Sequence, residues 1–255
     1  MKSNIFLREV LHFCFLEQLL KISDPKLYIL KGGVNLRFFF NSPRYSEDMD
    51  LDVIAGNVST LKKNGYKILN DSGFKRTLQT FGIEEVMVND PIKAKHTETT
   101  QRFKLQIIKS SGESLPTKIE FSRRKRLQGL YEYSSERIST EIAQRHNRLS
   151  FLCQHYSGPT AIIQKIEALA GRSLTQSRDI FDIFILTLGG YDKGLDLGKL
   201  DRKLIAKSKE AVLSLGYKDF QGQVLEYLDD EVRKLYSELQ NWNEIQKKVI
   251  GMLSL

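Results

Sequence analysis

The stretch from Lys31 to Val53 constrains this chain most, because it ends in acids at every second position. Residues two apart in a β-strand point to the same face. One face therefore carries Asp48, Asp50 and Asp52, and the other carries apolar side chains. Neighbouring carboxylates repel by about 1 kcal/mol or more per close pair. With no Cys or His nearby, the pattern predicts a cation held by oxygen ligands, and Mg²⁺ suits such ligands.

The composition is typical of a soluble globular protein. A chain of 255 residues can bury one large core or two modest ones. No apolar run approaches the roughly 20 residues of a membrane span, and Arg8 and Glu9 interrupt the apolar start, which disfavours a signal peptide. Cys14 and Cys153 lack the spacing of a zinc site and are interpreted as buried thiols. These features predict a cytoplasmic protein without membrane contact.

The charge balance is basic. Lys and Arg number 39 against 31 acids, which gives a net charge of +8 and favours a polyanionic partner such as nucleic acid or a nucleotide. The densest basic run is Arg123, Arg124, Lys125 and Arg126, directly after a predicted strand. Such a run is either a patch that contacts nucleic-acid phosphates or a solvated turn. The pattern leaves both open, as it does a merely basic soluble protein.

The first half of the chain mixes helix and strand patterns. Apolar residues recur at helical spacing near the N-terminus, and alternation with turn residues marks the strands. We expect helices at 3–21, 34–40 and 58–70, and strands at 27–30, 49–54, 84–88, 102–108 and 117–122. The strand 117–122 is expected to return beside the acid-bearing strand.

The second half is predicted to be mainly helical from about residue 134. One helix opens at Ser157, and Lys165 and Arg172 lie off its apolar stripe. Ser177 is the predicted N-cap of the next helix, and residues 195–255 are predicted to be amphipathic helix throughout. The change in pattern predicts a core domain at 1–130 and a helical domain at 131–255.

Two groups of residues in these elements suit phosphate and metal chemistry. Amides of a glycine pair at a helix start can face a phosphate, and Arg or Ser side chains donate to phosphate oxygens, which fits Gly32, Gly33, Arg44 and Ser46. Carboxylates that can hold Mg²⁺ are Asp48, Asp50 and, on a separate strand, Glu120. Together they form a ligand set for two-metal phosphoryl or nucleotidyl transfer.

At these residues the chain resembles the AbiEii-type nucleotidyltransferases, the toxins of abortive-infection toxin–antitoxin pairs in the DNA polymerase β-like superfamily. The first matching block is Lys31-Gly32-Gly33 with Arg44-Tyr45-Ser46-Glu47-Asp48-Met49-Asp50-Leu51-Asp52. The second is Lys165-Ile166-Glu167-Ala168-Leu169, Arg172 and Arg178-Asp179-Ile180-Phe181-Asp182. The blocks span residues 31–182, whereas the last ~70 residues match no motif of the family.

The resemblance implies an α+β fold, in which a polymerase-β-like core with a mixed sheet flanked by helices is followed by a helical bundle. It implies that the catalytic residues are Asp48, Asp50, Glu120, Lys165 and Asp179. Nucleotide binding is expected from Lys31, Gly32, Gly33, Arg44, Ser46, Lys165 and Arg172. The metal would be Mg²⁺, with Mn²⁺ as the alternative, on Asp48, Asp50 and Glu120.

Four of these acids have alternative roles. Asp52 is a third ligand or an acid paired with a neighbouring Arg, and Glu120 on a hairpin edge is by default a solvent-facing acid. Asp179 lies in a first helical turn, where the helix dipole alone favours an acid. Asp182 follows Arg178 by four residues, which favours an intrahelical pair.

The leading hypothesis is a Mg²⁺-dependent nucleotidyltransferase that moves an NMP from an NTP to an acceptor. The basic charge makes RNA the expected acceptor, and analogy with toxins of this type points to tRNA. As the toxin of such a pair it would have a cognate antitoxin. The alternative hypothesis is a non-catalytic nucleotide- or RNA-binding protein that retains the fold.

Overall fold

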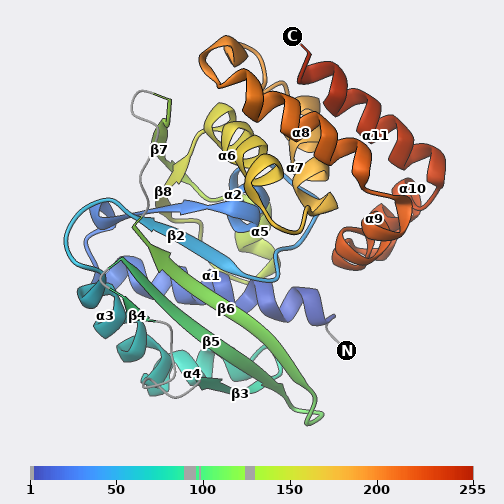
Figure 1. Cartoon of the computed structure of the whole chain (residues 1–255). Helices are drawn as coiled ribbons and strands as arrows, with labels where there is room; N and C mark the ends of the chain where they lie inside the picture. Colours follow the sequence, from blue (N-terminus) through green and yellow to red (C-terminus); the bar gives the residue numbers. More distant parts are fainter. Residues whose placement is uncertain (1–2, 89–95, 98, 124–129, 255) are drawn as a thin grey trace. The chain divides into compact units, whose positions relative to one another are not determined.

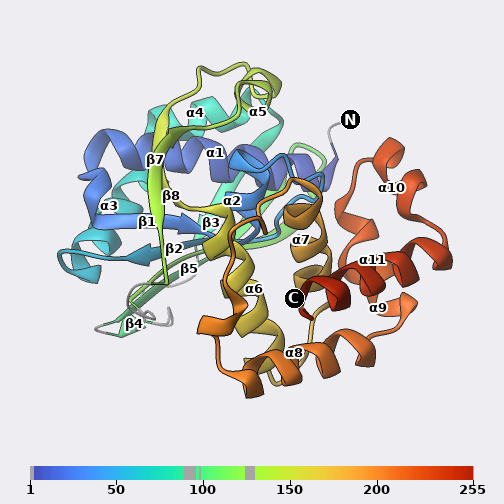
Figure 2. The ribbon, with the colours of Figure 1, turned by 90° about the horizontal axis from the view of Figure 1, so that it is seen from above.

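The structure, a computed structural model, describes residues 3–88, 96–97, 99–123 and 130–254 (Figures 1 and 2). The chain forms two compact units. Unit 1 comprises Met1–Phe39, Tyr45–Gly129 and Tyr133–Tyr156, and unit 2 comprises Phe40–Arg44, Leu130–Glu132 and Ser157–Leu255.

Unit 1 contains a mixed sheet in the order β3-β5-β6-β2-β1-β8-β7, with β4 paired to β5. Its strands are β1 (Tyr28–Lys31), β2 (Met49–Val53), β3 (Ile83–Val88), β4 (His96–Thr97), β5 (Thr100–Lys109), β6 (Ser114–Ser122), β7 (Tyr133–Arg137) and β8 (Leu152–Tyr156). The pairs β2–β6 and β1–β8 are parallel, whereas the other pairs are antiparallel. The expected mixed sheet is therefore present.

The helices of unit 1 are α1 (Asn4–Ile22), α2 (Gly32–Phe39), α3 (Val58–Asn70), α4 (Ser72–Gln79) and α5 (Thr140–Arg145), with a short 3-10 helix at Pro25–Leu27. Apolar side chains of β2, β5 and β6 pack with those of α1, α3 and α4 in one core. Figure 1 shows α1, α3 and α4 on the same face of the sheet. The acids of β2 alternate with these apolar residues and so belong to the opposite face.

Close packing fixes α3 to the sheet. A Cβ atom added at Gly65 would lie 2.4 Å from Cζ of Phe103 on β5, so the helix backbone touches the ring directly. Tyr66 packs edge-on against the same ring at 4.9 Å. Asn64 adds a hydrogen bond of 2.7 Å to Oγ of Ser23, just after α1.

The core of unit 1 contains both cysteines, as expected, and a group of aromatic rings. Cys14 and Cys153 are free and buried, and burial raises their thiol pKa values to about 11 and about 12. Phe38 lies in the core beside Phe13, and Phe39 stacks on the His155 ring at 3.6 Å.

Unit 2 is helical. Its helices are α6 (Gly158–Gly171), α7 (Ser177–Leu188), α8 (Arg202–Ser214), α9 (Tyr217–Gln223), α10 (Asp230–Tyr236) and α11 (Leu239–Met252), with 3-10 helices at Leu197–Lys199 and Leu225–Tyr227. Trp242 of α11 stacks on Phe220 of α9 at 4.8 Å, and both rings are buried. A core of its own thus supports this unit. No described helix is long and apolar enough to cross a membrane.

The α+β fold is confirmed, but several boundaries differ from those expected. Strands β7 and β8 occur where helix was predicted from residue 134, so the compact sheet unit extends to Tyr156 rather than 130. The region 195–255 is four α-helices separated by turns rather than helix throughout. The prediction missed α4, which Asp71 caps by accepting a bond from the Phe74 amide. Gln176, not Ser177, is the N-cap of α7.

The contact between α3 and the sheet predicts the effect of a single methyl group. Gly65→Ala should lower the free energy of unfolding by about 1–3 kcal/mol, because overpacking against Phe103 outweighs the helix propensity gained. Gly251→Ala on α11, where an added Cβ meets nothing within 4 Å, should be neutral or stabilise by up to about 1 kcal/mol. Urea titration followed by circular dichroism measures both. Equal effects of the two substitutions would contradict the packing argument.

Candidate active site

The acids of β2 and β6 meet on one face of the unit 1 sheet. Asp50 is the register partner of Glu120 across the parallel β2–β6 pair, and it also lies opposite Lys31 across the β1–β2 pair. Burial raises the pKa of Asp50, and the charges of Glu120 and Asp48 add to this rise, while Lys31 and Lys118 oppose it. The sheet thus gathers carboxylates that favour a nearby cation.

The glycine turn lies beside Asp50. Gly32 follows β1 directly, begins α2 and has φ of +70°, a conformation that favours glycine. A Cβ atom added there would lie 3.4 Å from Oδ2 of Asp50. The start of α2, where the first backbone amides have no partner within the helix, therefore adjoins Asp50.

Each of the outer acids has a basic partner. Asp48 accepts hydrogen bonds from the Lys118 ammonium at 2.6 Å and from the Lys118 amide at 3.1 Å. Glu120 accepts a bond of 2.6 Å from Nε of Arg102 on β5. Among residues 3–88, 96–97, 99–123 and 130–254, no three acid, His or Cys side chains are grouped closely enough to hold a metal ion. Ser46 is near the acids, and its hydroxyl donates to the Asp48 carbonyl at 2.7 Å.

Asp52 is a buried ion-pair residue. It forms a short ion pair with Lys31, accepts a bond of 2.8 Å from the Tyr156 hydroxyl, and is 4% exposed. Of its two expected roles, pairing is the one observed, but the partner is Lys31 rather than an Arg. Because Lys31 was expected to bind nucleotide, Asp52 and Tyr156 fix the position of a candidate binding group.

Unit 2 contains a second charged cluster, centred on Lys165. The Lys165 ammonium lies 2.8 Å from Oδ1 of Asp179 and 2.6 Å from Oδ2 of Asp182, and both acids are fully buried. Nε of Arg172 lies 3.1 Å from the other oxygen of Asp179. The predicted residues Lys165, Arg172 and Asp179 are thus brought together, with Lys165 itself 8% exposed.

Arg44 belongs to this cluster. Its Nε and Nη2 atoms donate to the two carboxylate oxygens of Asp182 at 3.0 and 2.8 Å. The expected pair between Asp182 and Arg178 is wrong, because Arg178 instead donates to the Gln176 side chain at 2.8 Å. Sequence spacing favoured a partner one turn away, whereas the fold supplies one 138 positions distant.

The described part of the predicted basic run is Arg123, which is exposed and bonds to the Gly56 carbonyl. Arg124, Lys125 and Arg126 lie outside the described residues. Sequence reasoning missed Lys118 and Arg102 as partners of the acids. Alternation along their strands was the available signal, because it places both on the acidic face.

The Asp182 cluster predicts a pH dependence for the stability of unit 2. Burial alone would raise the Asp182 pKa, but Arg44 and Lys165 outweigh it and lower the value to about 2. Since the unfolded value is about 3.9, the stabilisation is complete above pH ~4 and is lost as pH falls toward ~2, an effect of about 2–3 kcal/mol. Asp182→Asn should therefore destabilise most at neutral pH.

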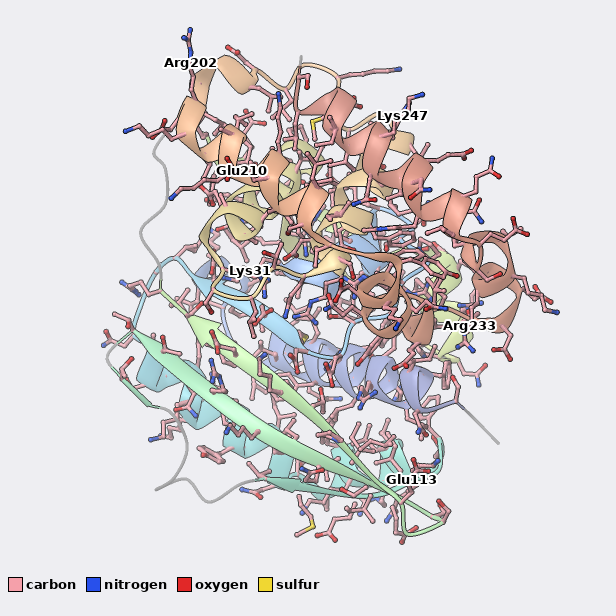
Figure 3. All side chains as sticks on the ribbon, turned by 45° about the vertical axis from the view of Figure 1, so that its right-hand side comes forward. Lys31, Glu113, Arg202, Glu210, Arg233 and Lys247 are labelled. Atoms are coloured by element: carbon pink, nitrogen blue, oxygen red, sulfur yellow. The ribbon has the colours of Figure 1, made fainter. Side chains whose placement is uncertain are left out.

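The fluorescence of Trp242, the single tryptophan and a buried residue of unit 2, measures this in urea titrations at pH 7 and pH 3. The exposed Glu210 of α8, labelled in Figure 3, supplies the matched control Glu210→Gln. A difference between Asp182→Asn and the parent that stays constant from pH 7 to pH 3 would contradict the ion-pair account.

Comparison with known proteins identifies similar nucleotidyltransferases. The family model described as Nucleotidyl transferase AbiEii toxin, Type IV TA system, matches residues 14–254. MenT4, a nucleotidyltransferase toxin from Mycobacterium tuberculosis, is similar in structure, with a TM-score of 0.64 and 16% identity over 98% of this chain and 84% of that chain.

Two crystal structures from Helicobacter pylori are similar at 17% identity. One has a TM-score of 0.57 and covers 100% of this chain and 98% of its own, and JHP933 has 0.54 with 100% and 95%. At such identities the likeness supports the fold alone. No curated protein matches the sequence. The family match covers nearly the whole chain and favours the enzyme over the binding-protein alternative. The chain therefore belongs to the AbiEii family of toxins of type IV toxin–antitoxin systems, and it is a nucleotidyltransferase.

Proposed function

We propose that this protein transfers an NMP from an NTP to an RNA acceptor, with Mg²⁺, or Mn²⁺ in its place, bound by Asp48, Asp50 and Glu120. The observation that carries the proposal is the register of β2 and β6, which aligns Asp50 with Glu120 on the face that adjoins the glycine turn. These carboxylates offer only hard oxygen atoms, the donors that both ions prefer.

The donor set fits a divalent ion chemically. A cation would offset the repulsion that contributes to the raised Asp50 pKa. Since Asp48 already holds Lys118 and Glu120 holds Arg102, an ion would compete with these side chains. When bound, a divalent ion lowers the pKa of an attacking hydroxyl and stabilises the charge on the leaving pyrophosphate.

Other residues of unit 1 have roles in holding the nucleotide. The amides at the start of α2, at Gly32 and Gly33, can donate to phosphate oxygens. The Ser46 hydroxyl has the same proposed role, because it can donate to a phosphate oxygen instead of the Asp48 carbonyl. Lys31, held by Asp52, provides a fixed positive charge on the same face as Asp50.

For unit 2 we propose that Lys165 and Arg172 bind the triphosphate and that Asp179 orients both. The two buried acids around Lys165 attract its ammonium and restrict its rotation. Arg44, which is fully engaged by Asp182, is better placed to position that acid than to bind phosphate directly.

RNA is the proposed acceptor because the net charge of +8 suits a polyanion. The family description names a toxin–antitoxin system, and we extend this to a cognate antitoxin as a partner of this chain.

Label transfer tests the reaction. Incubation with each α-labelled NTP, Mg²⁺ and total RNA should label RNA, and Asp48→Asn, Asp50→Asn and Lys165→Met should each lower the rate at least 100-fold, since each removes charge stabilisation of the reacting phosphates. Glu113→Gln, at the tip of the β5–β6 hairpin (Figure 3), should retain the parent rate. Absence of labelling by the parent with every NTP would refute the proposal.

Metal binding can be measured without turnover. Paramagnetic resonance of Mn²⁺ should detect binding to the parent that weakens at least tenfold in Asp50→Asn and Glu120→Gln, because each removes a charged ligand. Lys118→Gln should strengthen binding, because it removes the cation that competes for Asp48. Unchanged Mn²⁺ affinity in both acid variants would show that the metal is bound elsewhere.

A further inference from the structure

The positive charge of this protein is concentrated in one part of the chain. Residues 1–156 contain 25 Lys and Arg against 17 Asp and Glu, whereas residues 157–255 contain 14 of each. The whole net charge of +8 therefore comes from the part of the sequence that forms the sheet and its helices. A polyanion is attracted to where such charge is exposed.

Helices α3 and α4 carry a large share of this excess charge. Residues 58–79 include five basic residues and one acid, Asp71. The Asp71 carboxylate accepts the Phe74 amide at 2.7 Å as the N-cap of α4, so it is already engaged. We call the five basic side chains the α3–α4 surface: Lys62, Lys63, Lys67, Lys75 and Arg76.

The packing of the two helices turns these side chains away from the sheet. On α3 the buried positions include Leu61, Gly65 and Ile68, and on α4 they are Phe74 and Leu78. The basic residues are among the positions of each helix that are not buried. All are exposed except Lys62, which is half-buried. Because Gly65 is in contact with Phe103, the helix that presents three of them is held firmly on the sheet.

These five side chains have no carboxylate partner within ion-pair distance among the residues that the structure describes. Exposed helices usually offset such charges with acids three or four residues away, and like charges at that spacing destabilise a helix. Lys63 and Lys67 are four apart. The uncompensated charge is explained if an anionic partner neutralises it.

Arg123 connects this surface to the acidic face. It bonds to the Gly56 carbonyl, two residues before α3 begins, and it follows Glu120 by three residues. Three residues of extended chain span about 10 Å, and α3 extends the basic positions by about 14 Å from its start to Lys67. A polynucleotide is long enough to contact the α3–α4 surface while one end reaches the acids.

We infer that the α3–α4 surface binds the phosphate backbone of the RNA acceptor, an inference that rests on the proposed function. Binding of this kind reads charge and shape rather than sequence, because Lys and Arg contact phosphates. A competing surface on α8 carries Arg202, which points outward in Figure 3, and three lysines, but the acids of residues 157–255, Glu210 of the same helix among them, balance the basic residues of that part of the chain.

Charge reversal separates the two surfaces. The triple variant Lys63→Glu, Lys67→Glu, Arg76→Glu changes the α3–α4 surface, and Arg202→Glu, Lys203→Glu, Lys207→Glu changes α8 by the same charge. Affinity for unfractionated tRNA is measured by filter binding at several salt concentrations without Mg²⁺. The α3–α4 variant should raise Kd at least tenfold and lower the salt slope by about 2–3. The α8 variant should change Kd less than threefold.

Calorimetry with NTP and Mg²⁺ should give the parent affinity for both variants, which excludes misfolding. A milder triple, with Gln at the same three α3–α4 positions, should raise Kd by a smaller factor in the same direction. Three outcomes would each overturn the inference. The α3–α4 variants could bind tRNA with the parent affinity, or the α3–α4 and α8 charge-reversal variants could lose tRNA affinity equally. The third is that the parent binds anionic phosphatidylserine vesicles but not tRNA.

Failure of this inference is distinguishable from failure of the proposed function. If the parent labels RNA and the α3–α4 variant binds and labels it equally well, the surface assignment is wrong and the transfer reaction stands. Suppose instead that the α3–α4 variant loses tRNA affinity and that the parent fails to label RNA with any of the NTPs. The surface assignment then stands and the transfer reaction is wrong.

Discussion

The parallel pairing of β2 with β6 is the constraint on which the acidic face depends. It aligns Asp50 with Glu120, two carboxylates that repel, and it does so between strands that are 65–70 residues apart in sequence. The opposite faces of the same strands are mostly apolar and pack on α1, α3 and α4. Burial of that apolar side stabilises the sheet enough to hold the acids together, because each buried aliphatic or aromatic side chain contributes about 1.5–3 kcal/mol.

Basic side chains from neighbouring strands offset the charge of the acids on this face. Lys118, Arg102 and Lys31 each approach one acid of the face, so the cationic partners come from three different strands. Unit 2 follows the same rule at greater depth, where Asp182 is completely buried between Arg44 and Lys165. A buried charge requires such partners, since removing one of them leaves an uncompensated ion.

Local patterns predicted much of the fold and part of the candidate site. Alternation placed Asp50 and Asp52 on one face of a strand, although Asp48, expected on the same face, lies one residue before it, and the glycine pair correctly marked the start of a helix. Pairing between distant segments was beyond local patterns, and for that reason Asp182 was assigned to Arg178 instead of Arg44. The strands β7 and β8 were missed for a second reason. Strand β7 is an exposed edge strand with mostly polar residues, so it lacks the apolar alternation that marks a strand.

The two cysteines have a practical consequence for measuring distances. Cys14 and Cys153 are buried in unit 1, and their raised pKa values leave almost no thiolate at neutral pH, which is the form that reacts with maleimides. The native chain is therefore close to a cysteine-free background for labelling. One cysteine introduced on the surface of each unit would accept a fluorophore selectively, so energy transfer could follow the separation of the units when a nucleotide binds.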